Sequence, residues 1–140
     1  MTEPKTVFDP AAHGWEKLDE PGYPARMGGF WRKADGETML IGMLADAGHL
    51  NRNGSIHGGA VLGLADHALG QTSVFAGQGR KQATVQLDVQ FVAAPQEGDF
   101  MVARGEVVRM TRSIVFMRAE ITVGERLVAT ANGIWKVLGA

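Results

Sequence analysis

The segment Gly58–Ala76 carries the longest regular pattern in the chain. Its apolar residues fall on every side of a helical wheel instead of along one stripe, which is typical of a helix buried all round. At about 1.5 Å per residue, this helix would be roughly 28 Å long. A helix without a polar face needs a cover that curves around it.

Strand-like patterns lie on both sides of this helical segment. Before it, apolar stretches at 30–33 and 39–44 flank Asp35-Gly36, which is a strong hairpin signal. After it the period changes to two, and one face of the predicted strand carries Val85, Leu87, Val89 and Phe91. The other face carries Thr84, Gln86, Asp88 and Gln90. Three further stretches, 100–110, 114–123 and 127–138, predict an antiparallel meander.

This order predicts an α+β fold in which one curved antiparallel sheet of about five or six strands wraps one long central helix. Small residues on one face of the last strand, Ala129, Ala131 and Gly133, would leave room for the helix. Residues 1–25 contain four prolines and predict an extended lead-in with one helical turn near 11–18, while 26–140 form the single domain. The bare sheet edges predict pairing between copies of the chain.

Composition narrows the classes of function. A formal net charge of −1 provides no basic field for a phosphate backbone, so nucleic acid is not an expected partner. The absence of cysteine removes disulfides, thiolate metal sites and cysteine nucleophiles. Residues 1–13 contain no secretory signal and the apolar run 39–45 is too short to span a bilayer, so we expect a cytoplasmic protein without membrane partners. His13 and His49 lack partners at metal-ligand spacing, and we expect neither metal nor cofactor.

Asp66 is the residue that composition does not explain. It lies in the middle of the apolar helix, where a buried carboxylate without partners costs several kcal/mol. Three glycines, Gly59, Gly63 and Gly70, share its face at helical spacing and would clear a groove beside it. A ligand could approach there. The alternative is a structural aspartate bonded to a loop, with glycines that serve tight packing.

The start of the same helix provides a second group of interest. Gly58 and Gly59 lie in the first turn, where backbone N–H groups lack intrahelical acceptors and can stabilise a developing oxyanion. A carboxylate and such N–H groups together suit thioester hydrolysis. Gly58 and Asp66 are about 12 Å apart along one helix, too far for one carbonyl to touch both. The spacing therefore predicts that the two halves come from different subunits.

These residues also carry a resemblance to a known family. His57-Gly58-Gly59 followed by Asp66, the strand 84–91 and the Glu97-Gly98-Asp99 step are similar to the hotdog-fold acyl-CoA thioesterases of the PaaI-like type, which include phenylacetate-pathway and hydroxybenzoyl-CoA enzymes. The resemblance covers residues 28–138. It implies an acyl-CoA substrate that is hydrolysed to free acid and CoA, by homodimers that pair into homotetramers.

The resemblance also implies roles for single residues. The Gly58 N–H would bind the thioester oxygen, Asn51 would position the thioester or water, and Asp66 of the neighbouring subunit would be the nucleophile or general base. Thr84 matches a position where some members place a hydroxyl residue that helps to orient the water. Further substrate contacts are expected at His57, Gly59, Arg80 and Arg112, the two arginines facing the CoA phosphates.

Alternatives of other classes remain open at this point. A non-catalytic acyl-CoA or acyl-ligand binding module could use the same fold and would bind without releasing CoA. Hydratase chemistry would require a histidine facing a carboxylate, and no such pair is recognisable. His67 is expected to be packed or at the surface because it points to another side of the helix than Asp66. Trp15, Trp31 and Trp135 are expected in the core or at an interface.

Overall fold

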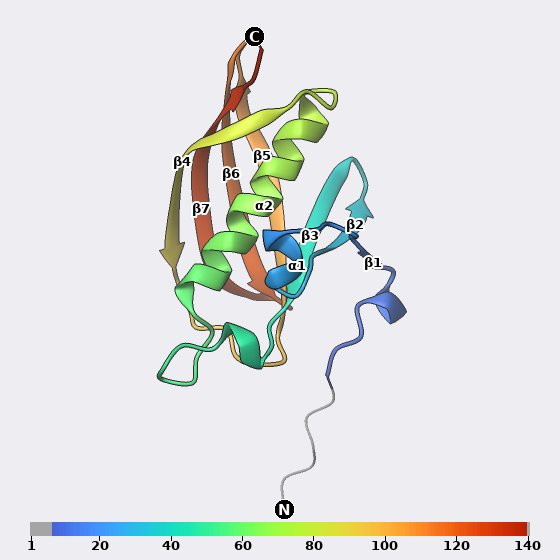
Figure 1. The fold of residues 1–140 in the computed structure, drawn as a ribbon, viewed down its shortest axis with the longest axis vertical. Coiled ribbons are helices and arrows are strands. Elements are labelled where there is room, and N and C mark those ends of the chain that lie inside the picture. Colours follow the sequence, from blue (N-terminus) through green and yellow to red (C-terminus); the bar gives the residue numbers. More distant parts are fainter. Residues whose placement is uncertain (1–6, 140) are drawn as a thin grey trace, which may run out of the picture.

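The computed structural model describes residues 7–139 of the chain. One long helix, α2, lies against a single seven-stranded antiparallel sheet of order β1-β2-β3-β5-β6-β7-β4 (Figure 1). The elements are η1 (Ala11–His13), β1 (Glu16–Lys17), α1 (Tyr23–Arg26), β2 (Trp31–Asp35), β3 (Thr38–Leu44), η2 (Ala47–His49), α2 (Gly58–Ala76), β4 (Gln82–Phe91), β5 (Phe100–Met110), β6 (Ile114–Val123) and β7 (Arg126–Val137).

The predicted architecture is confirmed, with one strand more than expected. The additional strand is β1, whose Glu16 and Lys17 pair with Arg32 and Trp31 of β2. A strand of two residues shows no alternation, so its pattern could not be detected in the lead-in. The Asp35-Gly36 hairpin, the helix 58–76 and the β5-β6-β7 meander all lie where the sequence predicts them.

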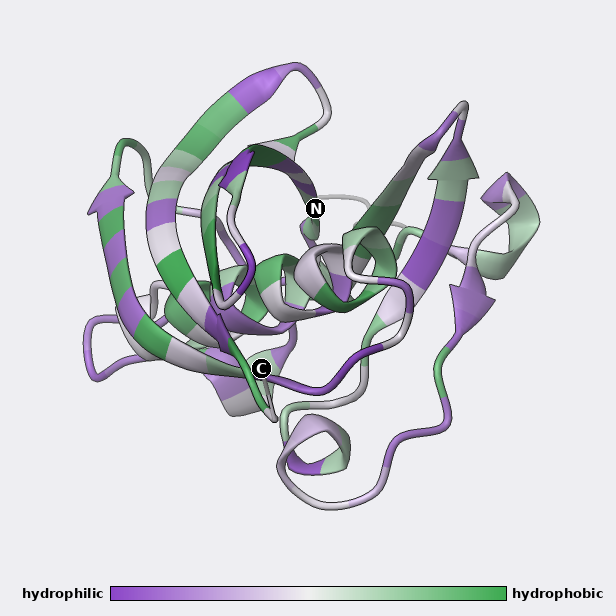
Figure 2. Ribbon diagram, turned by 90° about the horizontal axis from the view of Figure 1, so that it is seen from above, coloured by the Kyte–Doolittle hydropathy of each residue, from purple (hydrophilic) through white to green (hydrophobic). Residues whose placement is uncertain are grey.

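The sheet curves around α2, as Figure 2 shows from above, but it does not enclose the helix. The buried side of α2 packs on the sheet through Val61, Leu64, Ala65, Ala68 and Leu69. Leu62 is 42% exposed and Phe75 is 66% exposed, so the expectation of a helix buried on all sides is wrong. The reason is that a single open sheet covers one side of a cylinder, and the segment before β2 covers only part of the rest, through contacts such as Glu20 with His67 and Met27 with Gly63.

Small residues of β7 allow the helix and sheet to approach each other. Ala129, Ala131 and Gly133 are buried on the face toward α2, as predicted. Trp135 lies on the same face and is part of the core around α2. A Cβ at Gly133 would be 2.3 Å from the Trp135 ring and 2.9 Å from the Gln86 carbonyl oxygen. Gly133 therefore provides the space that the Trp135 indole occupies.

The first part of the lead-in packs on the opposite face of the sheet, whereas its later part reaches α2 through Leu18 and Glu20. Trp15, Leu40 and Phe100 form a second buried cluster there, with Phe8 and Trp31 against it. Residues 1–6 of the lead-in lie outside the described part of the chain. In residues 7–139, no helix is long and apolar enough to cross a membrane.

Gly133→Ala tests the contact between Gly133 and Trp135. Because the added methyl would overlap a rigid ring and a backbone carbonyl, the free energy of unfolding should fall by about 1–3 kcal/mol. Asn132→Ala, at the exposed neighbouring position, should change it by less than about 0.5 kcal/mol. Urea denaturation measures both, and equal stability of the two variants would contradict the packing described here.

Candidate active site

The loop before α2 is held by its own side chains. The Asn51 Oδ1 atom accepts hydrogen bonds from the backbone N–H groups of Asn53 (2.8 Å) and Ser55 (3.1 Å). The His49 ring is buried, bonds the Met27 carbonyl at 2.6 Å and accepts from the Asp46 N–H. The loop therefore delivers the chain to α2 in a defined position, with the Asn51 amide nitrogen as the side-chain group left for other contacts.

His57 caps the N-terminus of α2. Its Nδ1 atom accepts the Gly59 N–H at 2.8 Å, and its backbone is extended, as an N-cap requires. The neighbouring Gly58 N–H has no recorded acceptor among residues 7–139. The Phe91 ring lies 3.3 Å from the place that a Gly58 Cβ would take. One free N–H thus remains at the positive end of a 19-residue helix, under the edge of an exposed aromatic ring.

Asp66 lies on the uncovered flank of α2 and is partly buried. Its carboxylate Oδ1 accepts a hydrogen bond from the Thr84 hydroxyl at 2.7 Å. In the described part of the chain this is the only hydrogen bond recorded for the Asp66 carboxylate, and none comes from a loop. The carboxylate is oriented by one donor, which leaves its second oxygen available.

The predicted facing of Thr84 is wrong, and the reason is a β-bulge. The pairing of β4 with β7 shifts register between Thr84 and Gln86, so Val85 is an extra residue and is 60% exposed. On the C-terminal side of the bulge, Leu87 pairs with Gly133 and faces α2, as the alternation predicts. On the N-terminal side, Thr84 pairs with Trp135 and also faces α2. Strict alternation would have turned the Thr84 hydroxyl away from Asp66.

The three glycines that share the face of Asp66 serve different purposes. A Cβ at Gly63 would lie 2.6 Å from the Met27 side chain, so this glycine makes room for packing. A Cβ at Gly59 would lie 3.0 Å from the His57 ring. Gly70 differs from both, because its Cβ would lie 3.6 Å from the Trp135 Nε1 atom, an ordinary contact distance, so this position has room for a methyl group beside the indole N–H.

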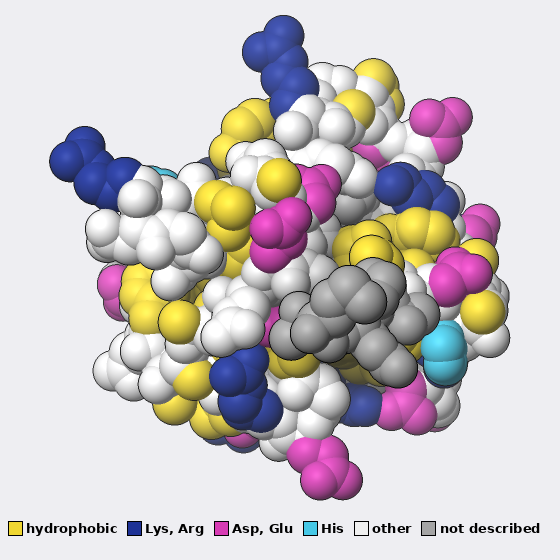
Figure 3. Space-filling model, turned by 90° about the horizontal axis from the view of Figure 1, so that it is seen from below, with side chains coloured by type: hydrophobic (Ala, Val, Ile, Leu, Met, Phe, Trp, Pro, Cys, Tyr) yellow, Lys and Arg dark blue, Asp and Glu magenta, His cyan; other side chains and the backbone are white. Residues whose placement is uncertain are grey.

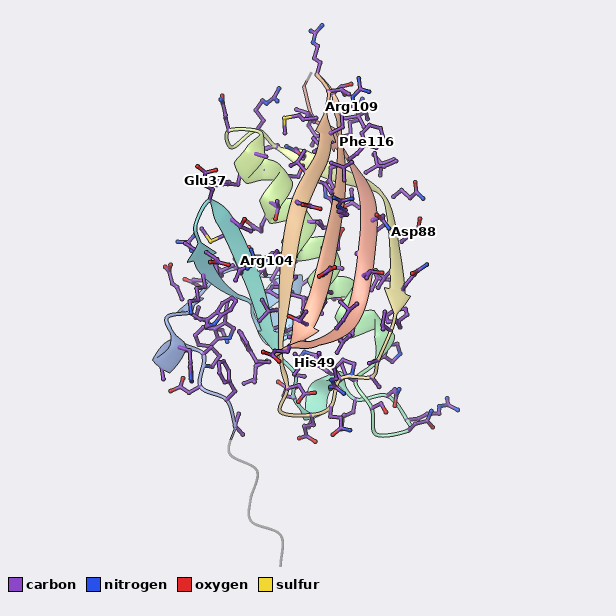
Figure 4. All side chains as sticks on the ribbon, turned by 180° about the vertical axis from the view of Figure 1, so that it is seen from behind. Glu37, His49, Asp88, Arg104, Arg109 and Phe116 are labelled. Atoms are coloured by element: carbon purple, nitrogen blue, oxygen red, sulfur yellow. The ribbon has the colours of Figure 1, made fainter. Side chains whose placement is uncertain are left out.

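The other candidate residues lie away from Asp66. His67 is packed, as expected: its ring stacks on Phe30 at 4.2 Å and bonds Glu20 at 2.9 Å. Arg80 lies in the turn after α2, where its Nε donates to the Gly77 carbonyl, and Arg112 lies exposed in the β5–β6 turn. Both turns are at the end of the sheet marked by Arg109, opposite to His49 (Figure 4).

Neither a metal-binding cluster nor a patch of one charge marks a second candidate site in the described residues. Among residues 7–139, no group of three or more His, Asp and Glu side chains could hold a metal ion. Acidic and basic side chains are interspersed with apolar ones on the face seen in Figure 3, in keeping with the net charge of −1.

α2 and β4 run antiparallel along one open side of the molecule. Three contacts join them in opposite order along the two elements: Gly58 with Phe91, Asp66 with Thr84, and Ser73 with Gln82. β4 is a terminal strand that pairs only with β7. The free N–H of Gly58 and the carboxylate of Asp66 therefore lie along the same open edge, about 12 Å apart by helical rise.

One long helix wrapped by a curved antiparallel sheet defines the hotdog class of fold. The family model described as the thioesterase superfamily matches residues 53–130. A Pseudomonas aeruginosa protein named as a candidate esterase is 32% identical over 111 residues, which cover 78% of this chain and 83% of that protein. The chain belongs to the thioesterase superfamily and is a thioester hydrolase.

Solved structures agree with this fold. The PaaI protein of the Escherichia coli phenylacetic acid degradation operon has a TM-score of 0.73 at 23% identity, covering 84% of each chain. A hypothetical thioesterase of Streptococcus pneumoniae, solved with coenzyme A, has a TM-score of 0.69 at 26% identity and covers 79% of this chain and 89% of that chain. The chain therefore has PaaI-like neighbours in fold.

His57→Ala tests the helix cap. Loss of the acceptor for the Gly59 N–H should lower the free energy of unfolding by about 1 kcal/mol. His57→Asn should retain most of the stability, because the asparagine oxygen can accept the same hydrogen bond. Thermal denaturation compares the two, and an alanine variant as stable as the wild type would show that the ring does not act as a cap.

Proposed function

We propose that this thioester hydrolase acts on acyl-CoA and releases free acid and CoA at two sites shared between two copies of the chain. The observation that carries the proposal is the pair of half-sites on one open edge. A single chain presents an oriented carboxylate at Asp66 and a free N–H at Gly58, too far apart to act on one carbonyl.

Pairing of two β4 edges would complete both sites. A two-fold axis between identical edge strands makes them antiparallel, so the start of one β4 lies next to the end of the other. Asp66 lies beside the start of β4, at Thr84, and Gly58 lies beside its end, at Phe91. The carboxylate of one subunit would then face the Gly58 N–H of the second copy, and the reverse would hold at the other site.

The chemistry follows from these two groups. The Gly58 N–H would donate to the thioester oxygen and stabilise the negative charge that develops on it. Asp66 would either remove a proton from the attacking water, which gives the free acid directly, or attack the carbonyl carbon itself and form a mixed anhydride. In both routes the thiolate of CoA would leave and be protonated. In the second route water would then cleave the anhydride, which releases the acid and restores the Asp66 carboxylate. The Thr84 hydroxyl would fix one carboxylate oxygen and leave the other to react. Three further residues would lie next to the thioester at the start of α2. They are His57, Gly59 and Asn51, the last through its amide nitrogen.

Recognition of the CoA moiety is proposed at the arginine-bearing turns. The streptococcal relative was solved with coenzyme A. Arg112 carries an exposed guanidinium and Arg80 is exposed beside the end of α2, where each could meet a phosphate. Association of two dimers into a homotetramer completes the proposed assembly, through surfaces other than the β4 edge.

Asp66→Asn tests the catalytic carboxylate. Asparagine can still accept the Thr84 hydrogen bond, so the fold and oligomer should persist, while kcat should fall by about 10²-fold to 10⁴-fold. Thr84→Val should lower kcat by about 10-fold to 100-fold, because the carboxylate loses a charge-assisted hydrogen bond. Thiol release from phenylacetyl, hydroxybenzoyl and short to long aliphatic acyl-CoAs measures both. Unchanged turnover in Asp66→Asn would refute the assignment, and binding without any thiol release would indicate a binding module.

Gly58→Pro tests the oxyanion donor. Proline is tolerated at the first helical position, and the extended backbone of His57 suits a residue before proline, so the variant should fold without the N–H. Its kcat should fall by about 10²-fold to 10³-fold, whereas Gly58→Ala, which keeps the N–H, should lose much less. Equal activity of the two variants would remove Gly58 from the mechanism.

The same variants test the sharing of sites. In a mixed dimer of Asp66→Asn and Gly58→Pro chains, one site carries both defects and the other carries none. Random mixing of equal amounts should restore about a quarter of wild-type activity, because half of the dimers are mixed and each holds one intact site. No recovery on mixing would show that each chain supplies a whole site.

A further inference from the structure

The space next to Asp66 is bordered by a tryptophan whose polar atom has no partner. Thr84 bonds Asp66 and pairs directly with Trp135 across β4 and β7, so both side chains lie on the face toward α2. Trp135 Nε1 in turn lies 3.6 Å from the place of a Gly70 Cβ. Gly70 follows Asp66 by one helical turn, about 6 Å along the axis, which closes a ring of four neighbouring residues.

The indole N–H of Trp135 faces this space. Trp135 is 2% exposed, and no hydrogen bond is recorded for its indole N–H in residues 7–139. Every fully buried side-chain nitrogen or oxygen in that part of the chain has a hydrogen-bond partner. Because the indole nitrogen has none, it is not fully buried, and part of the small exposed surface of Trp135 belongs to it. A tryptophan N–H in so buried a position normally finds an acceptor. The described residues supply none for Trp135.

Gly70 is not required by the fold. Glycine inside a helix is less favourable than alanine, and its usual reasons are a positive φ or a close neighbour. Gly70 has neither, since its φ is ordinary and the nearest atom to its Cβ would be at normal contact distance. At Gly63, by contrast, the Met27 side chain occupies the place of the missing methyl. The open position at Gly70 is therefore explained best by something that binds there.

We propose that the Trp135 indole N–H and the space over Gly70 select acyl groups that carry an oxygen acceptor about 6 Å from the thioester carbonyl. The inference rests on the proposed acyl-CoA hydrolysis at Asp66 and adds the chemistry of the acyl group. The oxygen accepts the hydrogen bond that Trp135 otherwise lacks. An acyl group without the oxygen leaves this N–H unsatisfied on binding, which disfavours it.

Matched substrates test this selection. The ratio of kcat/KM is measured for 5-oxohexanoyl-CoA against hexanoyl-CoA, and for 4-hydroxybenzoyl-CoA against benzoyl-CoA. The wild type should favour the oxygen-bearing member of at least one pair by about 5-fold or more, and Trp135→Phe should reduce that preference to near one. Gly70→Ala should lower kcat/KM for the favoured substrate while the protein remains at least as stable. Because both kcat/KM values of a pair scale with the same concentration of folded enzyme, their ratio does not depend on how much of a variant is folded.

The control is Trp31→Phe, the same substitution in β2 at the far side of the sheet from β4, which should keep the wild-type ratio. Equal use of both members by the wild type, or an unchanged ratio in Trp135→Phe, would overturn the inference and leave the proposed function intact. If no thiol release depends on Asp66, the proposed function fails instead. Calorimetric binding of the same pairs to Asp66→Asn and to Asp66→Asn with Trp135→Phe would then decide the inference separately.

Discussion

The burial of α2 by a single open sheet is the constraint from which the rest of the molecule follows. The sheet must curve to cover an apolar helix, and the small residues of β7 let it come close. Because the sheet is not closed, one flank of the helix remains bare next to the unpaired edge of β4. Asp66 lies on this flank, so the surface that holds the carboxylate is also the surface at which we propose that a second copy pairs.

A local irregularity in β4 connects the sheet to the chemistry. The bulge at Val85 lets Leu87 and Thr84 both face α2, although they lie three positions apart, an odd offset that strict alternation would place on opposite faces. The helix contributes a carboxylate and the strand contributes the hydroxyl that orients it. The position of this hydroxyl depends on the one extra residue in β4, Val85, which shifts the register of the strand.

Glycine serves several distinct functions around the same helix. Gly133 accommodates the Trp135 ring and Gly63 accommodates Met27. Gly58 presents a backbone N–H under the Phe91 ring, and Gly70 leaves room for a methyl group beside the Trp135 Nε1 atom. These four of the 19 glycines therefore meet separate packing and access requirements, whereas ten others have a positive φ.

The sequence alone determined the elements whose patterns are long: the bounds of the helix, the hairpin before it and the meander after it. It also indicated the fold class and the family, because the glycines at the helix start and Asp66 are contiguous or at helical spacing. It did not reveal β1, which is too short to show a period, or the facing of Thr84. Contacts between residues distant in the chain produce the bulge in β4, decide which side chain packs against each glycine and leave one flank of α2 bare. Only the tertiary structure determines such contacts.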